Sequence, residues 1–427
     1  MKPIVLTTIG SLGDLYPYLA LAGSLKQRGY TPIIATSEMY RQRVESQRID
    51  FWPVRPDLAD WGDERELYQR ITDLKTGTEY VIRHLIMPYL RASVEDLLPV
   101  ITEATLVITH PLTYASPILA EKYKIPWIST ALSPLTFLSK YDPPVLAPAL
   151  WLRHFHRWGP NFYGFWFYLL QQTVRSWTAP VRQLRQELGL PSAQHASLLA
   201  GFSPDLTLAW FSPQLATRQP DWPINTQLTG FLFYDREEFS SEMQLQVKQF
   251  LAAGPPPLVF TLGSAMIRGA NDFFNQSLTA ILTLKKRAIF IVGTELLDHL
   301  PQPLPSQVLV LEYAPFTYLF SHAAAIVHQG GIGTLAQALR AGRPMLIVPF
   351  SHDQPDNAER AVRLGVARCL LRQKYTAKTA TAELRQLLVN PLYSKKALAI
   401  SQLINQEKGI VTTCNLIEKY LITKYWQ

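Results

Sequence analysis

Short apolar runs that recur between helix-like stretches constrain the fold of this chain more than any other feature. The first four runs are IVLTT (4–8), PIIAT (32–36), LVIT (106–109) and PWIST (126–130). From Leu15 to Arg28, between the first two runs, apolar residues recur at helical spacing, and the pattern stops at Gly29. Strands alternating with helices predict a parallel sheet that is covered by helices on both faces.

A second series of such runs follows a stretch rich in proline and polar residues. Its members are PLVFTL (257–262), AIFIV (288–292), VLVL (308–311), AAIVH (324–328) and MLIVP (345–349). At 427 residues the chain is longer than a single domain with one hydrophobic core usually is. We therefore expect an α/β protein with two tandem Rossmann-like, doubly wound domains, 1–235 and 236–427, which face a central cleft. The last helix, through Asn415 to Tyr420, fits either domain.

Composition excludes several classes of protein. With 48% hydrophobic and 17% charged residues, the chain is not disordered. Its two cysteines, Cys369 and Cys414, support neither a disulfide framework nor a cysteine-rich zinc site. Met1 and Lys2 lead directly into a strand without a signal-peptide pattern, and no apolar run reaches the ~20 residues that span a bilayer. We expect a reducing, cytoplasmic setting.

A net charge of +8 accompanies an aromatic and basic insertion at about 141–185. Arginines 153, 157, 175 and 182 flank the aromatic run NFYGFWFYLL. Two interpretations carry equal weight: docking on an anionic membrane surface, which would make the protein peripheral on the cytoplasmic face, or an ordinary amphipathic helix with a basic exposed face. No motif for binding nucleic acid is present.

The sequence HQGGIGT predicts an anion site between a strand and a helix. His328 ends the strand, Ile332 lies within the turn, and Thr334 begins the helix. Glycines 330, 331 and 333 let the backbone approach a phosphate, which the helix start favours by ~0.3–2 kcal/mol per contact. His328 could add a hydrogen bond or a positive charge. When the motif is taken alone, a tight turn that binds no ligand is about as well supported as an anion site.

Polar residues after the neighbouring strands extend this site. Asp353 and Gln354 offer donors and acceptors for sugar hydroxyls, and we expect them to precede a helix capped by Asp356 or Asn357. Ser264, in TLGSA, can hold a phosphate oxygen. Tyr313 could stack on a nucleobase, although a core tyrosine is the commoner explanation.

The amino-terminal half supplies a candidate base. The loop IGSLGD places Gly10, Ser11, Gly13 and Asp14 after the first strand. A carboxylate there can accept the proton of a hydroxyl, an effect worth ~10²–10⁴-fold in rate. The competing interpretation makes Asp14 the N-cap of the helix from Leu15. His110 follows LVIT and either pairs with Asp14 or fills the turn.

Taken together, these blocks resemble the family 1, GT-B-fold nucleotide-sugar glycosyltransferases, with the nearest likeness to the rhamnolipid-forming rhamnosyltransferase and to the sterol and antibiotic branch. The resemblance rests on IGSLGDLYPYLALAGSLKQRG, YKIPWISTALSP, DWP, LTGF, PLVFTLGS, and HQGGIG with HDQPDNAERAVRLG. It implies an inverting, metal-independent transfer without a cofactor, in which a nucleotide sugar is the co-substrate.

The resemblance also implies roles for particular residues. Tyr313 and Ala314 correspond to the base contacts, and His328, Gly333 and Thr334 to the diphosphate site. Asp353 and Gln354 correspond to the sugar-holding pair, and Asp14 to the general base. His110 stands where plant enzymes carry an orienting aspartate. Ala336 replaces the plant glutamate that holds the ribose, and Phe316 replaces a plant glutamine. The nucleotide of the sugar donor can therefore be UDP or dTDP.

We therefore expect a hexosyltransferase that acts on a lipid-like hydroxyl: a fatty alcohol, a hydroxy fatty acid, a sterol or a carotenoid. Transfer to a soluble natural product is the alternative within the same class. A non-catalytic protein that binds nucleotide sugars or lipids is the alternative from another class. A sugar-nucleotide epimerase would need acid–base groups for which no pattern is present.

Overall fold

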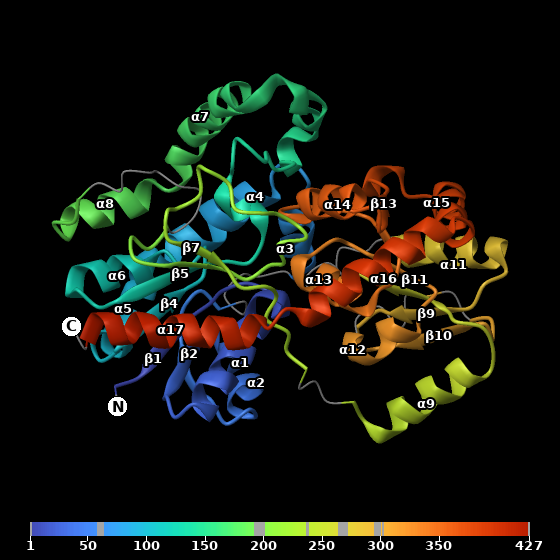
Figure 1. The fold of residues 1–427 in the computed structure, drawn as a ribbon, viewed down its shortest axis with the longest axis horizontal. Helices are drawn as coiled ribbons and strands as arrows, with labels where there is room; N and C mark the ends of the chain where they lie inside the picture. Colours follow the sequence, from blue (N-terminus) through green and yellow to red (C-terminus); the bar gives the residue numbers. More distant parts are fainter. Residues whose placement is uncertain are drawn as a thin grey trace.

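The computed structural model describes residues 2–57, 64–191, 201–235, 239–263, 272–293, 300 and 303–425. They form two α/β units, each built on a parallel sheet, that occupy opposite halves of the molecule (Figure 1). We call the unit with strands β1–β7 the N-terminal domain and the unit with β8–β13 the C-terminal domain. The expected division between residues 235 and 236 stays a prediction, because residues 236–238 lie outside the described part.

The N-terminal sheet has seven parallel strands. Across the sheet they are β3 (Asp50–Pro53), β2 (Pro32–Thr36), β1 (Ile4–Thr7), β4 (Leu106–Thr109), β5 (Trp127–Ala131), β6 (Thr207–Ala209) and β7 (Thr226–Leu228). All residues of β1, β4 and β5 are buried, because helices cover both faces of the sheet. The four strands predicted in this half are confirmed, whereas β3, β6 and β7 were not predicted.

Helices connect these strands. They are α1 (Leu12–Gln27), η1 (Glu38–Tyr40), α2 (Arg41–Glu45), α3 (Glu64–Ile71), α4 (Gly77–Tyr80), the π-helix η3 (Val81–Ile86), η4 (Met87–Tyr89), α5 (Leu90–Thr102), α6 (Ala115–Tyr123), η5 (Pro134–Phe137), η6 (Ala147–Trp158), α7 (Gly159–Trp177) and α8 (Ala179–Glu187). The aromatic insertion is therefore mainly helical, and α7 projects from the top of the molecule in Figure 1.

The C-terminal sheet has six parallel strands. In order they are β10 (Val308–Leu311), β9 (Ala288–Ile291), β8 (Leu258–Thr261), β11 (Ala325–His328), β12 (Met345–Ile347) and β13 (Ala367–Cys369). The accompanying helices are α9 (Ser241–Ala252), α11 (Phe273–Leu284), α12 (Phe316–Leu319), η9 (Phe320–His322), α13 (Ile332–Ala341), α14 (Gln354–Arg363), η10 (Arg372–Lys374), α15 (Ala377–Val389) and α16 (Pro391–Gln406). The five predicted strands are confirmed, and β13 was not predicted.

In each sheet the strand order reverses at the first strand. β1 lies between β2 and β4, and β8 lies between β9 and β11. Ligands of doubly wound sheets bind beyond the carboxyl ends of the strands at such a switch point. Asp14 lies at the start of the helix after β1, His110 directly follows β4, and His328 is the last residue of β11. The topology thus directs the candidate residues of both halves to the switch points.

The chain returns to the N-terminal domain at its end. Ser212 donates a hydrogen bond of 2.5 Å to Glu407, at the end of α16. The last helix, α17 (Gly409–Tyr425), then packs along α1, where Cys414 contacts Ser24. One hydrophobic cluster joins the two domains, since Phe137 and Phe211 belong to it together with Ala358 of α14. Among the described helices, none is long and apolar enough to cross a membrane.

Candidate active site

Asp14 lies in the first turn of α1 and takes part in its cap. Ser11 is the N-cap, and its backbone N–H and its hydroxyl donate to Asp14 Oδ2 at 2.8 and 3.0 Å. The helix begins at Leu12, so the expected start at Leu15 and the N-cap role for Asp14 are wrong. The S-x-x-D spacing of a capping box was the available signal. One third of the Asp14 side chain (32%) remains exposed, so the carboxylate is held but accessible.

His110 supports the same carboxylate from β4. Its Nε2 lies 3.4 Å from Asp14 Oδ1, and the Leu112 backbone N–H donates to its Nδ1. Because Nδ1 accepts a hydrogen bond, Nε2 carries a ring proton, and it faces Asp14. Burial acts to raise the pKa of Asp14, but the hydrogen bond and charge of His110, together with Ser11, hold it below its usual value. Asp14 is therefore ionised at neutral pH.

The glycine-rich turn between β11 and α13 has the conformation that an anion site requires. Gly330 has φ +94°, and a Cβ on it would lie 2.8 Å from Ile347 Cγ2. Gly331 is the N-cap of α13 and has no side chain with which to cap the helix. The amides at Ile332, Gly333 and Thr334 belong to the first turn and have no partner inside the helix. The helix begins two residues before the expected Thr334.

His328 contributes a hydrogen-bond donor to this turn. Its Nδ1 accepts from the Gly330 backbone N–H at 3.1 Å, so Nε2 carries the proton. That Nε2 is buried and has no partner among the residues that the structure describes. Burial lowers the pKa of His328 to about 3, which favours the hydrogen-bond alternative over a positive charge. Gln329 Oε1, Ser351 Oγ and Asn357 Oδ1 are also buried and find no partner within the described part of the chain. Such a group of unsatisfied polar atoms fits a site that a polar ligand completes.

Asp353 and Gln354 stand at the start of α14. Asp353 is the N-cap residue and Gln354 the first helical residue, so the expectation that both precede a cap at Asp356 or Asn357 is wrong. Asn357 donates to Asp353 Oδ2 at 2.8 Å and to the Gly330 carbonyl at 2.9 Å. Gln354 Oε1 accepts from the Phe350 N–H at 2.8 Å. The first turn of α14 is thereby joined to the glycine-rich turn.

Burial raises the pKa of Asp353 to about 7, although the Asn357 hydrogen bond acts downward. The charges of Asp14 and Asp356 also raise it. A carboxyl whose pKa is raised in the folded protein favours folding at low pH, and this contribution is lost as the pH rises through about 7.

We expect Asp353→Asn to stabilise the ligand-free protein by about 1–3 kcal/mol at about pH 8, and by much less at about pH 5. Thermal melts at the two pH values measure this difference. Asp50→Asn, on edge strand β3, is the control. An equal effect of Asp353→Asn at both pH values would contradict the assignment.

Two of the remaining predicted donor residues follow β10, the edge strand of the C-terminal sheet. Tyr313 is half-buried and Ala314 is buried, both just beyond β10. Ser264 lies outside the described residues. No group of three or more His, Cys, Asp or Glu side chains suited to a metal ion occurs in the described ranges.

The two halves of the site meet across the domain interface. A Cβ built on Gly333, in the first turn of α13, would lie 3.7 Å from Gly13 Cα, in the first turn of α1. His352 lies between the halves, and its Nδ1 is 3.1 Å from Thr78 Oγ1 of the N-terminal domain. Burial lowers the pKa of His352 to about 4 against the opposing charge of Asp14. Sequence reasoning missed His352, although it adjoins Asp353.

Comparisons with known proteins show the class of protein to which this chain belongs. Residues 4–141 match the glycosyltransferase family 28 N-terminal domain, and residues 280–408 match the erythromycin biosynthesis protein CIII-like C-terminal domain. The two matches meet at the candidate site from opposite sides. The chain is a glycosyltransferase of the GT-B fold. As in other GT-B glycosyltransferases, a nucleotide sugar is its co-substrate.

Relatives with described activities resemble this glycosyltransferase over nearly its whole length. The O-mycaminosyltylonolide 6-deoxyallosyltransferase of Streptomyces fradiae is 27% identical, and the alignment covers 99% of this chain and 98% of that protein. A sterol 3-beta-glucosyltransferase of Gibberella zeae is 28% identical over 95% of this chain, which spans only 28% of that longer protein. Among solved structures, CalG4, the calicheamicin glycosyltransferase, superposes with a TM-score of 0.70 at 17% identity, and the match covers 100% of both chains.

Proposed function

We propose that this glycosyltransferase moves a hexose from a UDP- or dTDP-sugar to a hydroxyl group of a lipid-like acceptor, with inversion at the anomeric carbon. The observation that carries the proposal is the meeting of the Asp14–His110 pair with the first turn of α13 across the domain interface. An acceptor hydroxyl between these groups would have a base on one side and the donor diphosphate on the other.

In this mechanism Asp14 is the base. Its ionised carboxylate accepts the proton of the acceptor hydroxyl, whose oxygen attacks the anomeric carbon from the face opposite the diphosphate. His110 is a positioning residue, because its Nε2–H holds one oxygen of Asp14 while Ser11 holds the other. The bond between the anomeric carbon and the diphosphate oxygen breaks as the new glycosidic bond forms.

The leaving nucleoside diphosphate is stabilised by hydrogen-bond donors of the C-terminal domain. We assign this role to the amides of Ile332, Gly333 and Thr334, to the Nε2–H of His328 and to Ser264. This mechanism routes no step through a metal ion. We assign Tyr313 and Ala314 to the nucleobase and Asp353 and Gln354 to the sugar. The solved structure of VinC, 21% identical with a TM-score of 0.68 over 98% of this chain and 99% of that one, holds dTDP, which makes dTDP-sugars a natural first test.

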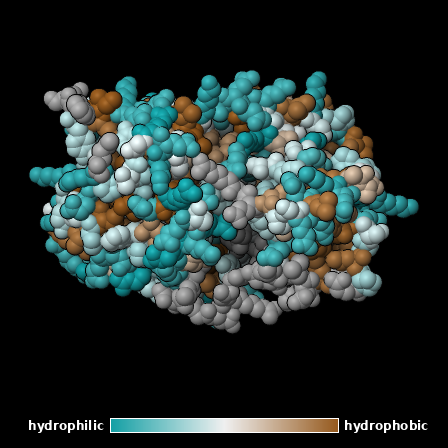
Figure 2. All heavy atoms as spheres, turned by 90° about the horizontal axis from the view of Figure 1, so that it is seen from below, coloured by the Kyte–Doolittle hydropathy of each residue, from teal (hydrophilic) through white to brown (hydrophobic). Residues whose placement is uncertain are grey.

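The helical insertion supports a lipid-like acceptor and a membrane surface as the place of reaction. Trp158 (63% exposed) and Phe165 (58% exposed) stand out from η6 and α7. Residues 143–186 contain arginines but neither Asp nor Glu. Arginines beside exposed aromatic rings suit an anionic bilayer surface. Figure 2 shows the face of the molecule away from this insertion, where hydrophilic and hydrophobic side chains are mixed.

The proposal is tested in two steps. Thermal shift identifies the best donor among UDP- and dTDP-hexoses, since a ligand at 100 times its Kd stabilises the fold by ~2.7 kcal/mol. The purified enzyme is then incubated with that donor and a total lipid extract, and the products are analysed by mass spectrometry. Glycosylated lipids support the proposal. Transfer only to soluble phenolic acceptors would overturn the lipid assignment.

A second candidate acceptor class is a soluble natural product. It is favoured by the 6-deoxyallosyltransferase relative, which this chain matches over 98% of that protein's length. A soluble macrolide added to the same assay decides between the two classes.

We also expect the insertion to bind membranes. Trp158→Ala combined with Phe165→Ala should weaken co-sedimentation with vesicles that contain phosphatidylglycerol by about tenfold, because two interfacial aromatic anchors are lost. Val389→Ala is the matched control, since Val389 is an exposed apolar residue of α15 in the other domain. Equal binding by the double variant and by the control would contradict membrane docking through this insertion.

A further inference from the structure

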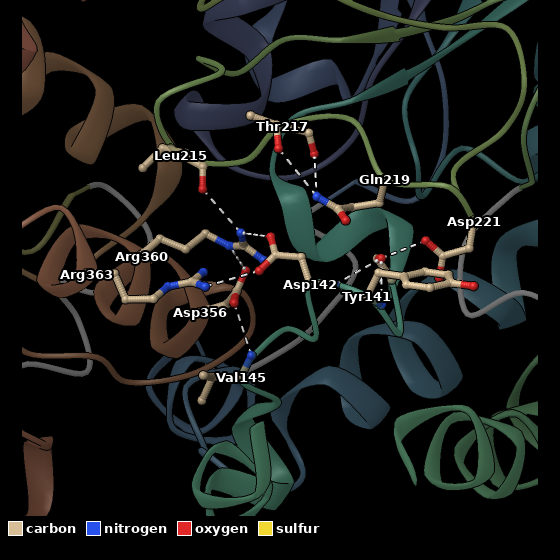
Figure 3. Close-up of polar contacts among 11 residues, drawn as sticks. Tyr141, Asp142, Val145, Leu215, Thr217, Gln219, Asp221, Asp356, Arg360 and Arg363 are labelled. Atoms are coloured by element: carbon tan, nitrogen blue, oxygen red, sulfur yellow. Dashed lines mark hydrogen bonds and ion pairs between the residues drawn. The ribbon is translucent and has the colours of Figure 1, made fainter. Parts of the chain in front are cut away.

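A buried ion-pair cluster joins α14 to the N-terminal domain (Figure 3). Arg360, whose side chain is 1% exposed, donates through Nε to Asp356 at 2.8 Å and through Nη1 to Asp142 at 2.5 Å. Its Nη1 also donates to the Leu215 carbonyl at 3.2 Å. The second oxygen of Asp356 accepts from the Val145 N–H at 3.0 Å. Two segments of the N-terminal domain, the loop 142–145 and Leu215, thus hold one helix of the C-terminal domain.

Asp142 is itself anchored on its own side of the interface. The Ser139 hydroxyl donates to Asp221 at 2.6 Å, and the Lys140 N–H donates to the other oxygen of Asp221 at 2.8 Å. The Asp142 N–H in turn donates to Ser139 Oγ at 3.3 Å. The Asp142 carboxylate therefore approaches Arg360 from a loop whose position is already fixed.

A second contact between the domains lies on the other side of Asp353 and Gln354, the residues proposed to hold the sugar. His352, with φ +56°, lies directly before Asp353 and contacts Thr78. A positive φ is strained for a non-glycine residue and persists only where its surroundings enforce it. Asp353 and Gln354 are therefore flanked by His352–Thr78 on one side and by the Arg360 cluster on the other.

We infer that these two contacts form a bracket that positions Asp353 and Gln354 relative to Asp14, and that Arg360 is its central positioning residue. The bracket consists of His352–Thr78 and of Arg360 with Asp356, Asp142 and Val145. The inference rests on the proposed roles of Asp14 and of the sugar pair.

The physical reason is geometric. A buried ion pair adds little net stability, but it accepts only one arrangement of its partners. The sugar is held by one domain and the base belongs to the other, so their separation depends on how the domains dock. A displacement of about 1 Å at a reacting centre can cost about 10²-fold in rate. Because Asp142 belongs to the insertion and lies before its helix η6, the same contacts link the insertion to the position of the sugar.

The test separates turnover from binding in Arg360→Lys and Asp142→Asn. Lysine keeps the charge but lacks the planar fork that reaches two carboxylates at once. We expect kcat to fall by about tenfold or more in both variants. The fall should occur both in transfer to the acceptor that the wild type uses and in hydrolysis of the donor by water. The KM of the nucleotide sugar should change by less than about threefold. The Kd of UDP or dTDP alone should stay at the wild-type value, because the glycine-rich turn is unchanged.

Arg185→Lys is the matched control. Arg185 is buried and binds Glu121 at 2.7 Å and the Pro191 carbonyl, all within the N-terminal domain. Thr78→Val tests the other contact of the bracket, should Arg360→Lys fail to fold. Wild-type kcat in folded Asp142→Asn and Thr78→Val, or an equal loss in Arg185→Lys, overturns the inference. The test does not depend on the acceptor assignment, because water serves as the acceptor in donor hydrolysis. If Asp14 is not the base, that failure shows in the turnover of Asp14 variants and not in the variants used here.

Discussion

Replacement of Asp14 with asparagine is expected to lower the turnover number for sugar transfer by about 10²–10⁴-fold. The amide retains the shape of the side chain and an oxygen that can accept from Ser11, but it cannot take the proton of the acceptor hydroxyl. The KM of the donor should remain near the wild-type value, because the residues proposed to bind the donor belong to the other domain. Steady-state kinetics at saturating donor measure the change.

The matched control is Asp73→Asn, which replaces an exposed aspartate that stabilises a turn through Thr76. Turnover of Asp14→Asn within about threefold of the wild type would remove Asp14 as the base. The pKa of Asp14 is lowered, so its carboxylate stabilises the fold above the ordinary aspartate pKa of about 4, and this contribution is lost as the pH falls through the folded-state value. The assay should therefore be run near neutral pH, where the wild-type base is ionised.

Gly330→Ala is expected to destabilise the protein by about 1–3 kcal/mol and to weaken donor binding. Two effects act together. Alanine is strained at φ +94°, and its Cβ would lie 2.8 Å from Ile347 Cγ2 and 3.2 Å from the Gln354 carbonyl oxygen. Relief of this contact would move the turn away from the first turn of α14. Thermal unfolding and titration with UDP or dTDP measure the two effects.

Gly29→Ala separates strain from crowding. Gly29 also has a positive φ, +88°, but a Cβ there would meet no atom within 4 Å. This control should cost about 1 kcal/mol through strain alone and leave the nucleotide affinity unchanged. If Gly330→Ala behaves like Gly29→Ala in both measurements, the close packing of the glycine-rich turn has no role in donor binding.

The sequence predicted the central strands well because each is a continuous apolar run buried on both faces. The strands that it missed, such as β6 and β7, have three residues and lie toward one edge of the sheet, so they carry no comparable pattern. Helix starts were misplaced where caps decide them. Ser11 and Gly331, not the first apolar residue of the periodic stretch, mark the beginnings of α1 and α13.

The candidate site was predictable as two separate motifs, but not as one arrangement. Nothing in the local pattern around Asp142 indicates that it meets Arg360, which is 218 positions away along the chain. His352 was overlooked because its contact with Thr78 spans 274 positions. Contacts of this kind depend on how the two domains dock, whereas strand patterns depend only on which residues must avoid water.

The return of the chain at Glu407 and the packing of α17 along α1 have a practical consequence for engineering. Both ends of the described chain lie on the N-terminal domain (Figure 1), so the C-terminal domain is topologically an insert with two junctions. A chimera that takes this domain from a relative through a single crossover would also import a foreign α17. That helix would have to match Ser24 and Arg28 of α1, which bind Cys414 and Glu418. Exchange of donor specificity therefore calls for two crossovers, with the second placed at the turn between α16 and α17.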